Sequence, residues 1–344
     1  MLNKQKIVVL RFSAMGDVAM VAAVLREFCA QNPNTEVIMV SRPAFEPFFN
    51  EIPNVTFHSI YPKTTHQGIL GLFKLFKSLK KLKPTAIADL HENLRSRIIC
   101  SFFRFTRVKI ARINKGRAEK KALTRLQNKI LKPLKPTVNR YADVFTALGF
   151  KCRLSHQLIK TPQPITSKIS YLFTNTVTKK VGISPFAQHS YKVYPLEKME
   201  EVVKTLSEKG YELFIFGGGK NEAEIGESWQ TKYKNVSNLI GKHGLNEELD
   251  IISNLDLMLS MDSAGMHMAS LVGIPVVSIW GPTHPYAGFL GYGQIESDCL
   301  QIAHPSRPNS IYGNKPCLCG DVPCIALVKP EIIVEKIISK LKHG

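Results

Sequence analysis

Short runs of β-branched and other apolar residues alternate with helical patterns along almost the whole chain of 344 residues. Such an alternation is typical of βαβ units, which build α/β domains with parallel sheets covered by helices. Ligands bind such domains at the carboxyl ends of the strands. The predicted strands are 6–10, 36–40, 55–60, 86–90 and 108–111 in the first half and 180–183, 213–216, 257–259 and 275–279 in the second, and the predicted helices include 18–29, 69–82, 118–131, 196–208, 222–230, 264–271 and 330–341.

The length of the chain favours two domains of ordinary size. A polar stretch with several Pro and Thr residues separates the two halves, so we predict a first domain over 1–150, a linker over 151–178 and a second domain over 179–344. The helix 330–341 is a candidate to pack back on the first domain. The apolar run 19–25 is far shorter than the ~20 residues that span a bilayer, and no signal-peptide core is evident. We therefore expect a cytoplasmic protein.

Positive charge is concentrated in the first half of the chain. Residues 1–150 contain 26 Lys and Arg against 9 Asp and Glu, a net +17, whereas the remaining 194 residues contain 20 against 18, a net +2. This asymmetry indicates a polyanionic partner, which is a nucleic acid, an anionic membrane surface or a phosphorylated substrate. Arg117, Lys121, Arg125 and Lys129 repeat every four residues along the predicted helix 118–131. Like charges at this spacing repel, so the row is either a solvated face or a face neutralised by an anion.

Three of the seven cysteines cluster in the sequence as C-x-C-x4-C, at Cys317, Cys319 and Cys324. A zinc site usually has four ligands and C-x2-C spacing, and no fourth ligand is evident nearby. Reduced thiols, with an oxidisable pair among them, therefore fit the cluster better than a metal site. We predict no metal ligands in this chain.

The junction after the first predicted strand, 11–17, carries the first candidate site. Asp17 lies near the start of the following helix. In one interpretation, Ser13 or Asp17 simply caps this helix. In the other, Asp17 lies at the cleft end of the strand and accepts a proton from a substrate hydroxyl. The dinucleotide motif G-x-G-x-x-G, a complete P-loop and a D-x-D carboxylate pair are all missing from the sequence. Metal-dependent binding of phosphates is therefore disfavoured.

The second half has three comparable junctions. A helix begins at Ser263 directly after a predicted strand, and the free N–H groups of such a helix start bind anions, although Asp262 or Ser263 equally suits a plain cap. Lys192 precedes a helix that begins after Pro195. From this position its side chain either reaches a phosphate in the cleft or lies in solvent. The glycines 217–219, followed by Glu222, allow a ligand to approach the backbone closely.

Taken together, these motifs resemble those of glycosyltransferase family 9, the ADP-heptose:lipopolysaccharide heptosyltransferases and their relatives. The matching motifs span almost the whole chain. They are R-x-S-x-x-G-D (Arg11, Ser13, Gly16, Asp17), K-x-[WY]-P (Lys192, Tyr194, Pro195), D-[ST]-x-x-x-H (Asp262, Ser263, His267) and G-P-T-x-P (Gly281, Pro282, Thr283, Pro285). The resemblance implies a GT-B fold, in which two Rossmann-like doubly wound domains face each other across a cleft.

The resemblance also implies an activity: inverting, metal-independent transfer of a sugar, heptose from ADP-heptose, to a phosphorylated acceptor of the lipopolysaccharide core or lipid A type. Asp17 would be the general base, and Lys192 would stabilise the leaving diphosphate together with the start of the helix at Ser263. No cofactor other than the nucleotide-sugar donor is expected. The implied donor-binding residues are Asp262 (sugar hydroxyls), Glu222 (ribose), His267 (phosphate region), Ser263, Ala264, Gly265, Gly218 and Gln188, and the acceptor-binding residues are Arg11, Ser13, His91, Arg117, Lys121 and Arg125.

The chain departs from the family pattern on the donor side. Ala264 stands where a glycine often follows D-[ST], Tyr194 replaces a usual Trp, and Ala187 and Gln188 replace a hydroxyl-bearing pair before Lys192. The basic half would meet its lipid acceptor at the inner leaflet, as a peripheral protein of the inner membrane. Two alternatives stay open: an inactive GT-B-like protein that only binds a glycolipid, and a nucleic-acid-binding protein, which the absence of a recognisable nucleic-acid motif disfavours.

Overall fold

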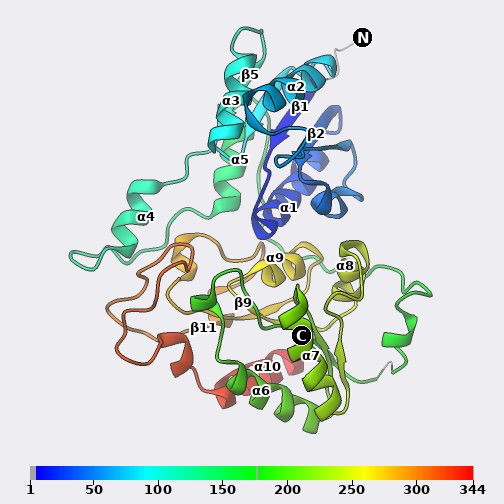
Figure 1. The fold of residues 1–344 in the computed structure, drawn as a ribbon, viewed down its shortest axis with the longest axis vertical. Coiled ribbons are helices and arrows are strands. Elements are labelled where there is room, and N and C mark those ends of the chain that lie inside the picture. Colours follow the sequence, from blue (N-terminus) through cyan, green and yellow to red (C-terminus); the bar gives the residue numbers. More distant parts are fainter. Residues whose placement is uncertain (1–4, 176, 344) are drawn as a thin grey trace. The chain divides into compact units, whose positions relative to one another are not determined.

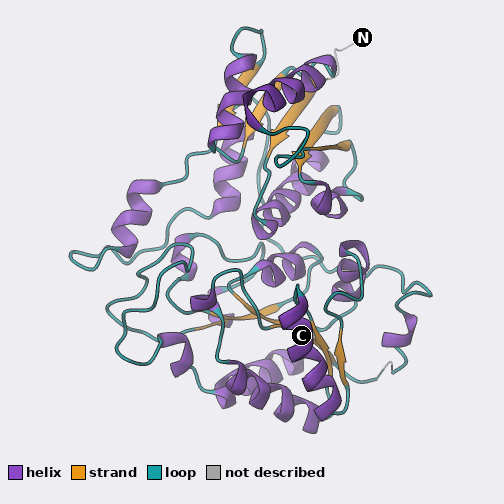
Figure 2. Cartoon of the chain, viewed as in Figure 1, coloured by secondary structure: helices purple, strands orange, loops and turns teal. Residues whose placement is uncertain are grey.

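The structure is a computed structural model that describes residues 5–175 and 177–343. The chain forms two compact units, each built around one parallel sheet with helices on it (Figures 1 and 2). The first unit consists of Met1–Lys115 and Thr137–His156, and the second of Gly116–Pro136 and Gln157–Gly344.

The sheet of the first unit has the strand order β3-β2-β1-β4-β5. Its order reverses between β1 and β4, which are hydrogen-bonded neighbours, and this switch point is where doubly wound domains bind ligands. Apolar residues of α2 and α3 pack together on one face of the sheet. The elements are β1 (Gln5–Leu10), α1 (Met15–Gln31), β2 (Thr35–Ser41), the 3₁₀ helix η1 (Pro43–Phe49), β3 (Val55–Ser59), α2 (Gly68–Lys81), β4 (Ala86–Asp89), α3 (Leu94–Phe103), β5 (Lys109–Arg112) and α5 (Thr137–Ala147).

The sheet of the second unit has the order β11-β10-β9-β6-β7-β8, and its switch point lies between β6 and β9. The last helix, α10, packs on α6, β9 and β10 of this same unit. The elements are α4 (Arg117–Thr124), η2 (Ser170–Leu172), β6 (Lys180–Ser184), η3 (Ser190–Lys192), α6 (Leu196–Glu208), β7 (Glu212–Ile215), α7 (Lys220–Lys232), β8 (Val236–Asn238), α8 (Leu245–Ser253), β9 (Leu257–Met261), α9 (Ala264–Leu271), β10 (Val276–Ile279), η4 (Pro285–Ala287), η5 (Glu296–Asp298), β11 (Cys299–Leu300), η6 (Cys324–Leu327) and α10 (Pro330–His343).

The segment 116–136, which we placed in the first domain, belongs to the second unit. Its buried Leu123 and Leu134 form a small apolar cluster with Ala287, and Tyr286 and Phe289 pack against this cluster. The expected linker 151–178 is divided between the units, because residues up to 156 belong to the first and later ones to the second. Apart from η2, its described residues form no helix or strand.

The helix of this segment is shorter than predicted. α4 ends at Thr124, and Arg125 has extended backbone angles (φ −67°, ψ 148°), so the predicted helix 118–131 is wrong beyond its first turns. The basic row therefore does not continue on one helix. Arg125 donates through Nε to the carbonyl of Asn128, and Lys129 donates through Nζ to the carbonyl of Pro308.

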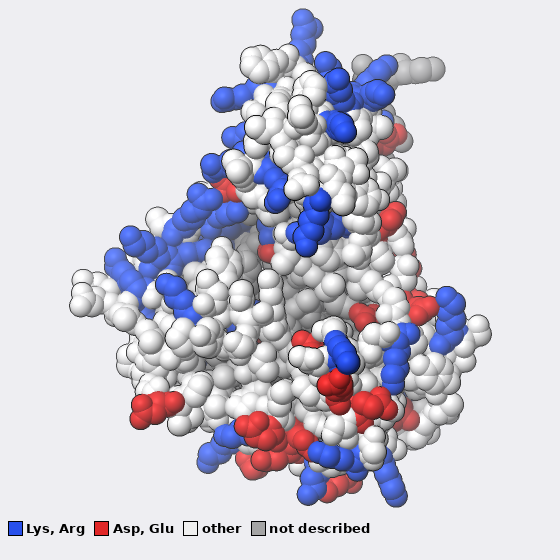
Figure 3. Space-filling model, viewed as in Figure 1, with Lys and Arg blue, Asp and Glu red and all other residues white. Residues whose placement is uncertain are grey.

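The positive charge is distributed over both units. The first unit contains 21 Lys and Arg against 8 Asp and Glu, and the segment 116–136 contains 7 against 1, whereas residues 157–344 contain 18 of each. On the face shown in Figure 3, Lys and Arg side chains gather over the first unit and over α4, while most Asp and Glu side chains lie over the second unit. No helix in the described part of the chain combines the length and apolar character needed to cross a bilayer.

Candidate active-site residues in the two units

The first unit holds Asp17 by two contacts at its switch point. The carboxylate of Asp17 forms an ion pair with the guanidinium of Arg11, and it accepts a hydrogen bond of 3.3 Å from the backbone N–H of Ala14, the residue that caps α1. Arg11 is itself buried, donates to the carbonyl of Leu90 at 2.9 Å and lies 5.9 Å from the ring centre of Tyr141. Asp17 thus assists the helix cap and is held as a charged, partly exposed carboxylate at the end of β1.

His91 lies beside Arg11, directly after β4. Its Nδ1 accepts the backbone N–H of Phe12 at 3.1 Å, which joins the ends of β1 and β4. Burial, together with the nearby cations of Arg11 and Lys115, lowers the pKa of His91 to about 3. The imidazole is therefore neutral at neutral pH and positions the backbone between Arg11 and Ser13 as an acceptor.

Asp89, which the sequence analysis missed, fixes the turn that carries His91. It is fully buried and accepts hydrogen bonds from the backbone N–H groups of His91 and Glu92 and from the hydroxyl of Ser96. Burial raises the pKa of Asp89, and these hydrogen bonds oppose that shift. The signal in the sequence was a carboxylate at the end of an apolar strand, four residues before the Asn that caps α3.

In the second unit, Lys192 and Asp262 lie on opposite sides of the switch point and form an ion pair of 3.0 Å. Both side chains are largely buried, with 15% and 8% of their surface exposed. The backbone of Gly313 packs on the Lys192 stem, since a Cβ there would lie 2.2 Å from its Cγ and Cδ. Lys192, predicted to bind the diphosphate, and Asp262, predicted to bind the sugar, are thus paired with each other. A ligand that binds either side chain in its predicted role would have to break this ion pair.

The start of α9 adjoins this pair. Its cap residue, Ser263, makes no capping hydrogen bond through its side chain, and its hydroxyl lies 3.3 Å from that of Ser260. A Cβ on Gly265 would lie 2.4 Å from the hydroxyl of Ser184 at the end of β6, so glycine allows the helix to begin close to the strand. Ala264 is the first helical residue, and His267 is buried one turn further on. The positive end of the helix dipole therefore lies next to Lys192.

The remaining predicted donor residues occupy the same edge of the sheet. Glu222, at the start of α7, accepts the backbone N–H of Gly218 at 2.7 Å, so its carboxylate fixes the glycine turn after β7. β7 neighbours β6, and their carboxyl ends meet at one edge. Gln188 lies exposed in the loop after β6.

The predicted acceptor residues are divided between the two units. Arg11, Ser13 and His91 belong to the first unit, whereas Arg117, Lys121 and Arg125 belong to the second, in the segment 116–136. Arg307, which the sequence analysis missed, holds the G-P-T turn: it is buried and donates to the carbonyls of Gly281 and Thr283, at 2.6 and 2.9 Å. A lone Arg between Ser and Pro gives no sequence signal for this role.

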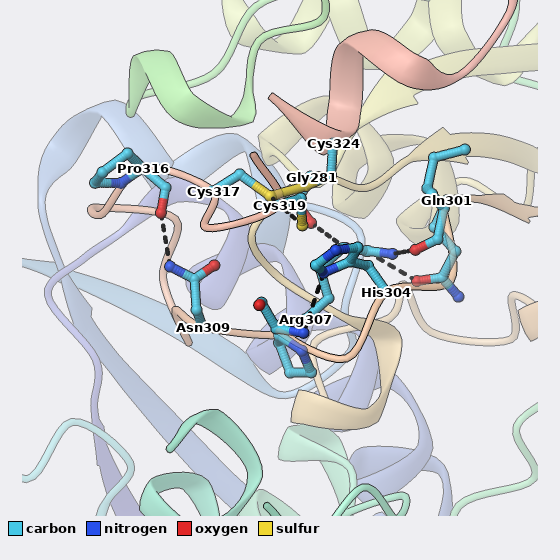
Figure 4. The surroundings of a disulfide bond; sticks show 12 residues. Gly281, Gln301, His304, Arg307, Asn309, Pro316, Cys317, Cys319 and Cys324 are labelled. Atoms are coloured by element: carbon cyan, nitrogen blue, oxygen red, sulfur yellow. Dashed lines mark hydrogen bonds between the residues drawn. A yellow bond between two sulfur atoms is a disulfide. The ribbon is translucent and has the colours of Figure 1, made fainter. Parts of the chain in front are cut away.

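Two of the three clustered cysteines form the expected oxidisable pair. Cys317 and Cys324 are joined by a disulfide, and Cys319 lies beside them as a thiol (Figure 4).

Comparisons with known proteins agree with the family that the motifs resemble. The model of glycosyltransferase family 9 (heptosyltransferase) matches residues 72–293. The chain is 27% identical over 282 residues to the lipopolysaccharide core heptosyltransferase OpsX of Haemophilus influenzae, covering 80% of this chain and 79% of the relative. It is 24% identical over 280 residues to an Escherichia coli lipopolysaccharide heptosyltransferase 3, covering 78% and 81%.

Solved structures share the fold over the whole chain. A family 9 glycosyltransferase from Veillonella parvula superposes with a TM-score of 0.77 at 18% identity, covering 100% of this chain and 99% of that one. The ADP-heptose lipopolysaccharide heptosyltransferase II of E. coli superposes with a TM-score of 0.67 at 17% identity, covering 98% and 99%. The predicted GT-B class is confirmed.

Proposed function

Because the chain belongs to glycosyltransferase family 9 and is a glycosyltransferase of GT-B fold, we propose that it transfers heptose from ADP-heptose to a phosphorylated acceptor of the lipopolysaccharide core or lipid A type. Transfer inverts the anomeric configuration and needs no metal. The observation that carries the proposal is the ion pair of Arg11 and Asp17 at the switch point of the first sheet. It holds the carboxylate of Asp17 at the edge of the sheet where doubly wound domains bind ligands.

Asp17 acts as the general base. The acceptor hydroxyl gives its proton to the Asp17 carboxylate while its oxygen attacks the anomeric carbon, and the bond from that carbon to the diphosphate breaks. One displacement from the opposite side inverts the configuration, and ADP leaves with the bonding electron pair. Arg11 and the N–H of Ala14 fix the carboxylate, so that little motion is needed for the proton transfer.

Lys192 and the start of α9 stabilise the leaving diphosphate. When the donor binds, its diphosphate replaces Asp262 as the ion-pair partner of Lys192. The carboxylate of Asp262 then accepts hydrogen bonds from the sugar hydroxyls. The N–H groups at Ala264 and Gly265 add the positive end of the helix dipole. This arrangement supplies the positive charge that a divalent cation supplies in enzymes with a carboxylate pair.

Metal independence is tested with EDTA. We expect the turnover of the enzyme in EDTA to equal that of the untreated enzyme, and added Mg²⁺ or Mn²⁺ to leave it unchanged. The matched control is a magnesium-dependent glycosyltransferase in the same buffer. Activity that falls in EDTA and returns with Mg²⁺ or Mn²⁺, but not with Zn²⁺, would contradict this part of the proposal.

An exposed apolar rim supports association with the membrane. Ile69 and Leu70 begin α2 and Leu94 begins α3, with exposed fractions of 67%, 80% and 75%. Both helices start at the carboxyl edge of the sheet, the edge that carries Arg11 and Asp17, and the exposed Lys74 and Arg95 flank the apolar residues. Apolar side chains beside cations suit the headgroup region of an anionic leaflet. We name Ile69, Leu70 and Leu94 the apolar rim.

The central test is Asp17→Asn, which keeps the size of the side chain and its oxygen acceptor. Turnover should fall by at least ~10²-fold, the lower range for a lost general base, while the affinity for ADP-heptose measured by calorimetry stays unchanged. Glu46→Gln, which removes one exposed carboxylate from the same unit, is the control and should keep wild-type turnover. Wild-type turnover in Asp17→Asn would exclude this base, and no donor turnover in the wild type would favour a protein that only binds glycolipid.

A further inference from the structure

Three cysteine sulfurs meet in the second unit, at the end of the loop that follows β11. The sulfur of Cys319 lies 3.1 Å from that of Cys317, which is bonded to Cys324, and all three sulfurs lie within 4.8 Å of one another. Cys324 is fully buried and the other two are half-buried. None of these groups takes part in the proposed transfer of heptose. We call the three residues the thiol cluster.

Two cations without a carboxylate partner lie beside the thiol cluster. Arg307 is only 3% exposed, and its guanidinium donates hydrogen bonds to backbone carbonyl oxygens and to the amide oxygen of Gln301. Lys129 donates to the carbonyl of Pro308 at 2.9 Å. Neither makes an ion pair with Asp or Glu among the residues that the structure describes. A buried cation with only neutral partners is costly, so this part of the fold favours a negative charge.

We propose that, once the disulfide is reduced, the thiol cluster binds a soft divalent cation of the zinc class. A dithiol reductant supplies two electrons and two protons to break the bond between Cys317 and Cys324. The cation then displaces one proton from each of the three thiols, and the resulting tris-thiolate complex has a net charge of −1. That charge complements Arg307 and Lys129.

The spacing of the sulfurs suits such an ion. Tetrahedral zinc with Zn–S bonds of about 2.3 Å holds its sulfurs about 3.8 Å apart. The observed separations, 3.1 Å for Cys317 and Cys319 and at most 4.8 Å for the group, lie on either side of this value. No His, Asp or Glu of the described residues joins the group, so water or an added ligand takes the fourth position.

The ion would fix the loop 301–323 against the donor residues. Arg307 and the N–H groups of Asn309 and Ser310 already hold the turn at Pro282, and Asn309 also donates to the carbonyl of Pro316 at 2.6 Å. Gly313 of the same loop packs on the Lys192 stem. The role of the cation is therefore structural, and it is compatible with a transfer reaction that needs no metal.

The test uses the full-length protein reduced with a phosphine and dialysed free of metal. Titration with Co²⁺ should give a thiolate-to-metal charge-transfer band that saturates at one equivalent, and Zn²⁺ should displace Co²⁺ and abolish the band. Cys317→Ser and Cys319→Ser should each lose stoichiometric binding. Cys299→Ser, which changes a half-buried cysteine outside the thiol cluster, should bind like the wild type. Circular dichroism at 222 nm checks that each variant is folded.

Two results would overturn the proposal. The first is a reduced, folded wild type that binds no stoichiometric Co²⁺ or Zn²⁺. The second is a Cys319→Ser variant with wild-type affinity, which would reduce the site to an ordinary cysteine pair. Both readouts are independent of sugar transfer, so they stand whether or not the proposed function holds.

Discussion

The neutral state of His91 follows from its burial and from the two cations near it. In an unfolded chain a histidine titrates near pH 6.5, whereas burial and the charges of Arg11 and Lys115 lower the pKa of His91 to about 3. Between these two pH values His91 is protonated in the unfolded chain and neutral in the folded protein. The free energy of unfolding therefore falls as the pH falls through this window, by at most about 1.4 kcal/mol per pH unit for this residue.

His91→Asn tests this assignment, because the Asn oxygen can replace Nδ1 as the acceptor for the N–H of Phe12. We expect the free energy of unfolding of the variant to fall less between pH 7 and pH 5 than that of the wild type, by up to about 2 kcal/mol. Urea unfolding at the two pH values measures it. His284, whose pKa burial lowers to about 4, is present in both proteins and cancels in the comparison. Parallel pH dependences would show that His91 does not carry the effect.

The site could be predicted from the sequence only as far as the ends of its elements. A charged residue after an apolar strand is visible in the sequence, and Asp17 and Asp262 were found in this way, whereas Lys192 was found as the lysine that precedes a helix beginning after Pro195. The contact between Lys192 and Asp262 could not be predicted, because it depends on the adjacency of β6 and β9 across 70 residues of chain. Asp89 and Arg307 were missed because their partners are mostly backbone groups, which no residue type identifies.

At the scale of elements, all strands of the first sheet were predicted, and in the second sheet only the short edge strands β8 and β11 were missed. β1, β4, β6 and β9 are buried on both faces and appear in the sequence as continuous apolar runs. β8 and β11 have three and two residues, too few to show a pattern. α4 was predicted too long because its basic period continues past Thr124, although the chain there turns to bury Leu134.

Substitutions of two adjacent lysines of α4 distinguish the effect of packing from the effect of surface charge. Lys120 is buried with its ammonium group 4.3 Å from the ring centre of Phe289, whereas Lys121 is exposed. Lys120→Gln should lower the free energy of unfolding by ~1 kcal/mol or more, since a desolvated cation–π contact is lost. Lys121→Gln should leave it within about 0.5 kcal/mol and should weaken binding to anionic vesicles about fivefold, or ~1 kcal/mol.

Denaturant unfolding and vesicle sedimentation measure the two effects, and each variant is the matched control for the other. Equal effects of the two changes on stability would mean that Lys120 does not pack on Phe289. Unchanged vesicle binding of Lys121→Gln would leave this residue as a solvated position.

At the scale of the whole molecule, the charge divides into three parts. The first unit and the segment 116–136 are basic, and residues 157–344 are neutral. Attraction to an anionic surface therefore belongs to two stretches of the chain that lie in different units. The apolar rim is part of the first of these, so apolar and electrostatic contributions to membrane binding can be separated by mutation.

Leu70→Gln combined with Leu94→Gln should lower partitioning into anionic vesicles about tenfold or more, because two leucine side chains lose their burial in the bilayer interface. Turnover with a detergent-free, deacylated acceptor should stay at the wild-type level, since the variant keeps Arg11 and Asp17. Ile332→Gln, an exposed apolar residue of α10 in the second unit, is the control. Wild-type partitioning of the double variant would assign membrane binding to charge alone.

The packing of the segment 116–136 has a consequence for the synthesis of the protein. Leu123 and Leu134 emerge from the ribosome about 150 residues before Tyr286 and Phe289, the aromatic residues that pack against their cluster, a delay of about 8–30 s at ~5–20 residues per second. During that time a nascent chain carries an apolar and strongly basic stretch whose packing partners in the second unit have not yet been synthesised. Ribosomal RNA is itself a polyanion, so this stretch can be retained there until the second unit is complete.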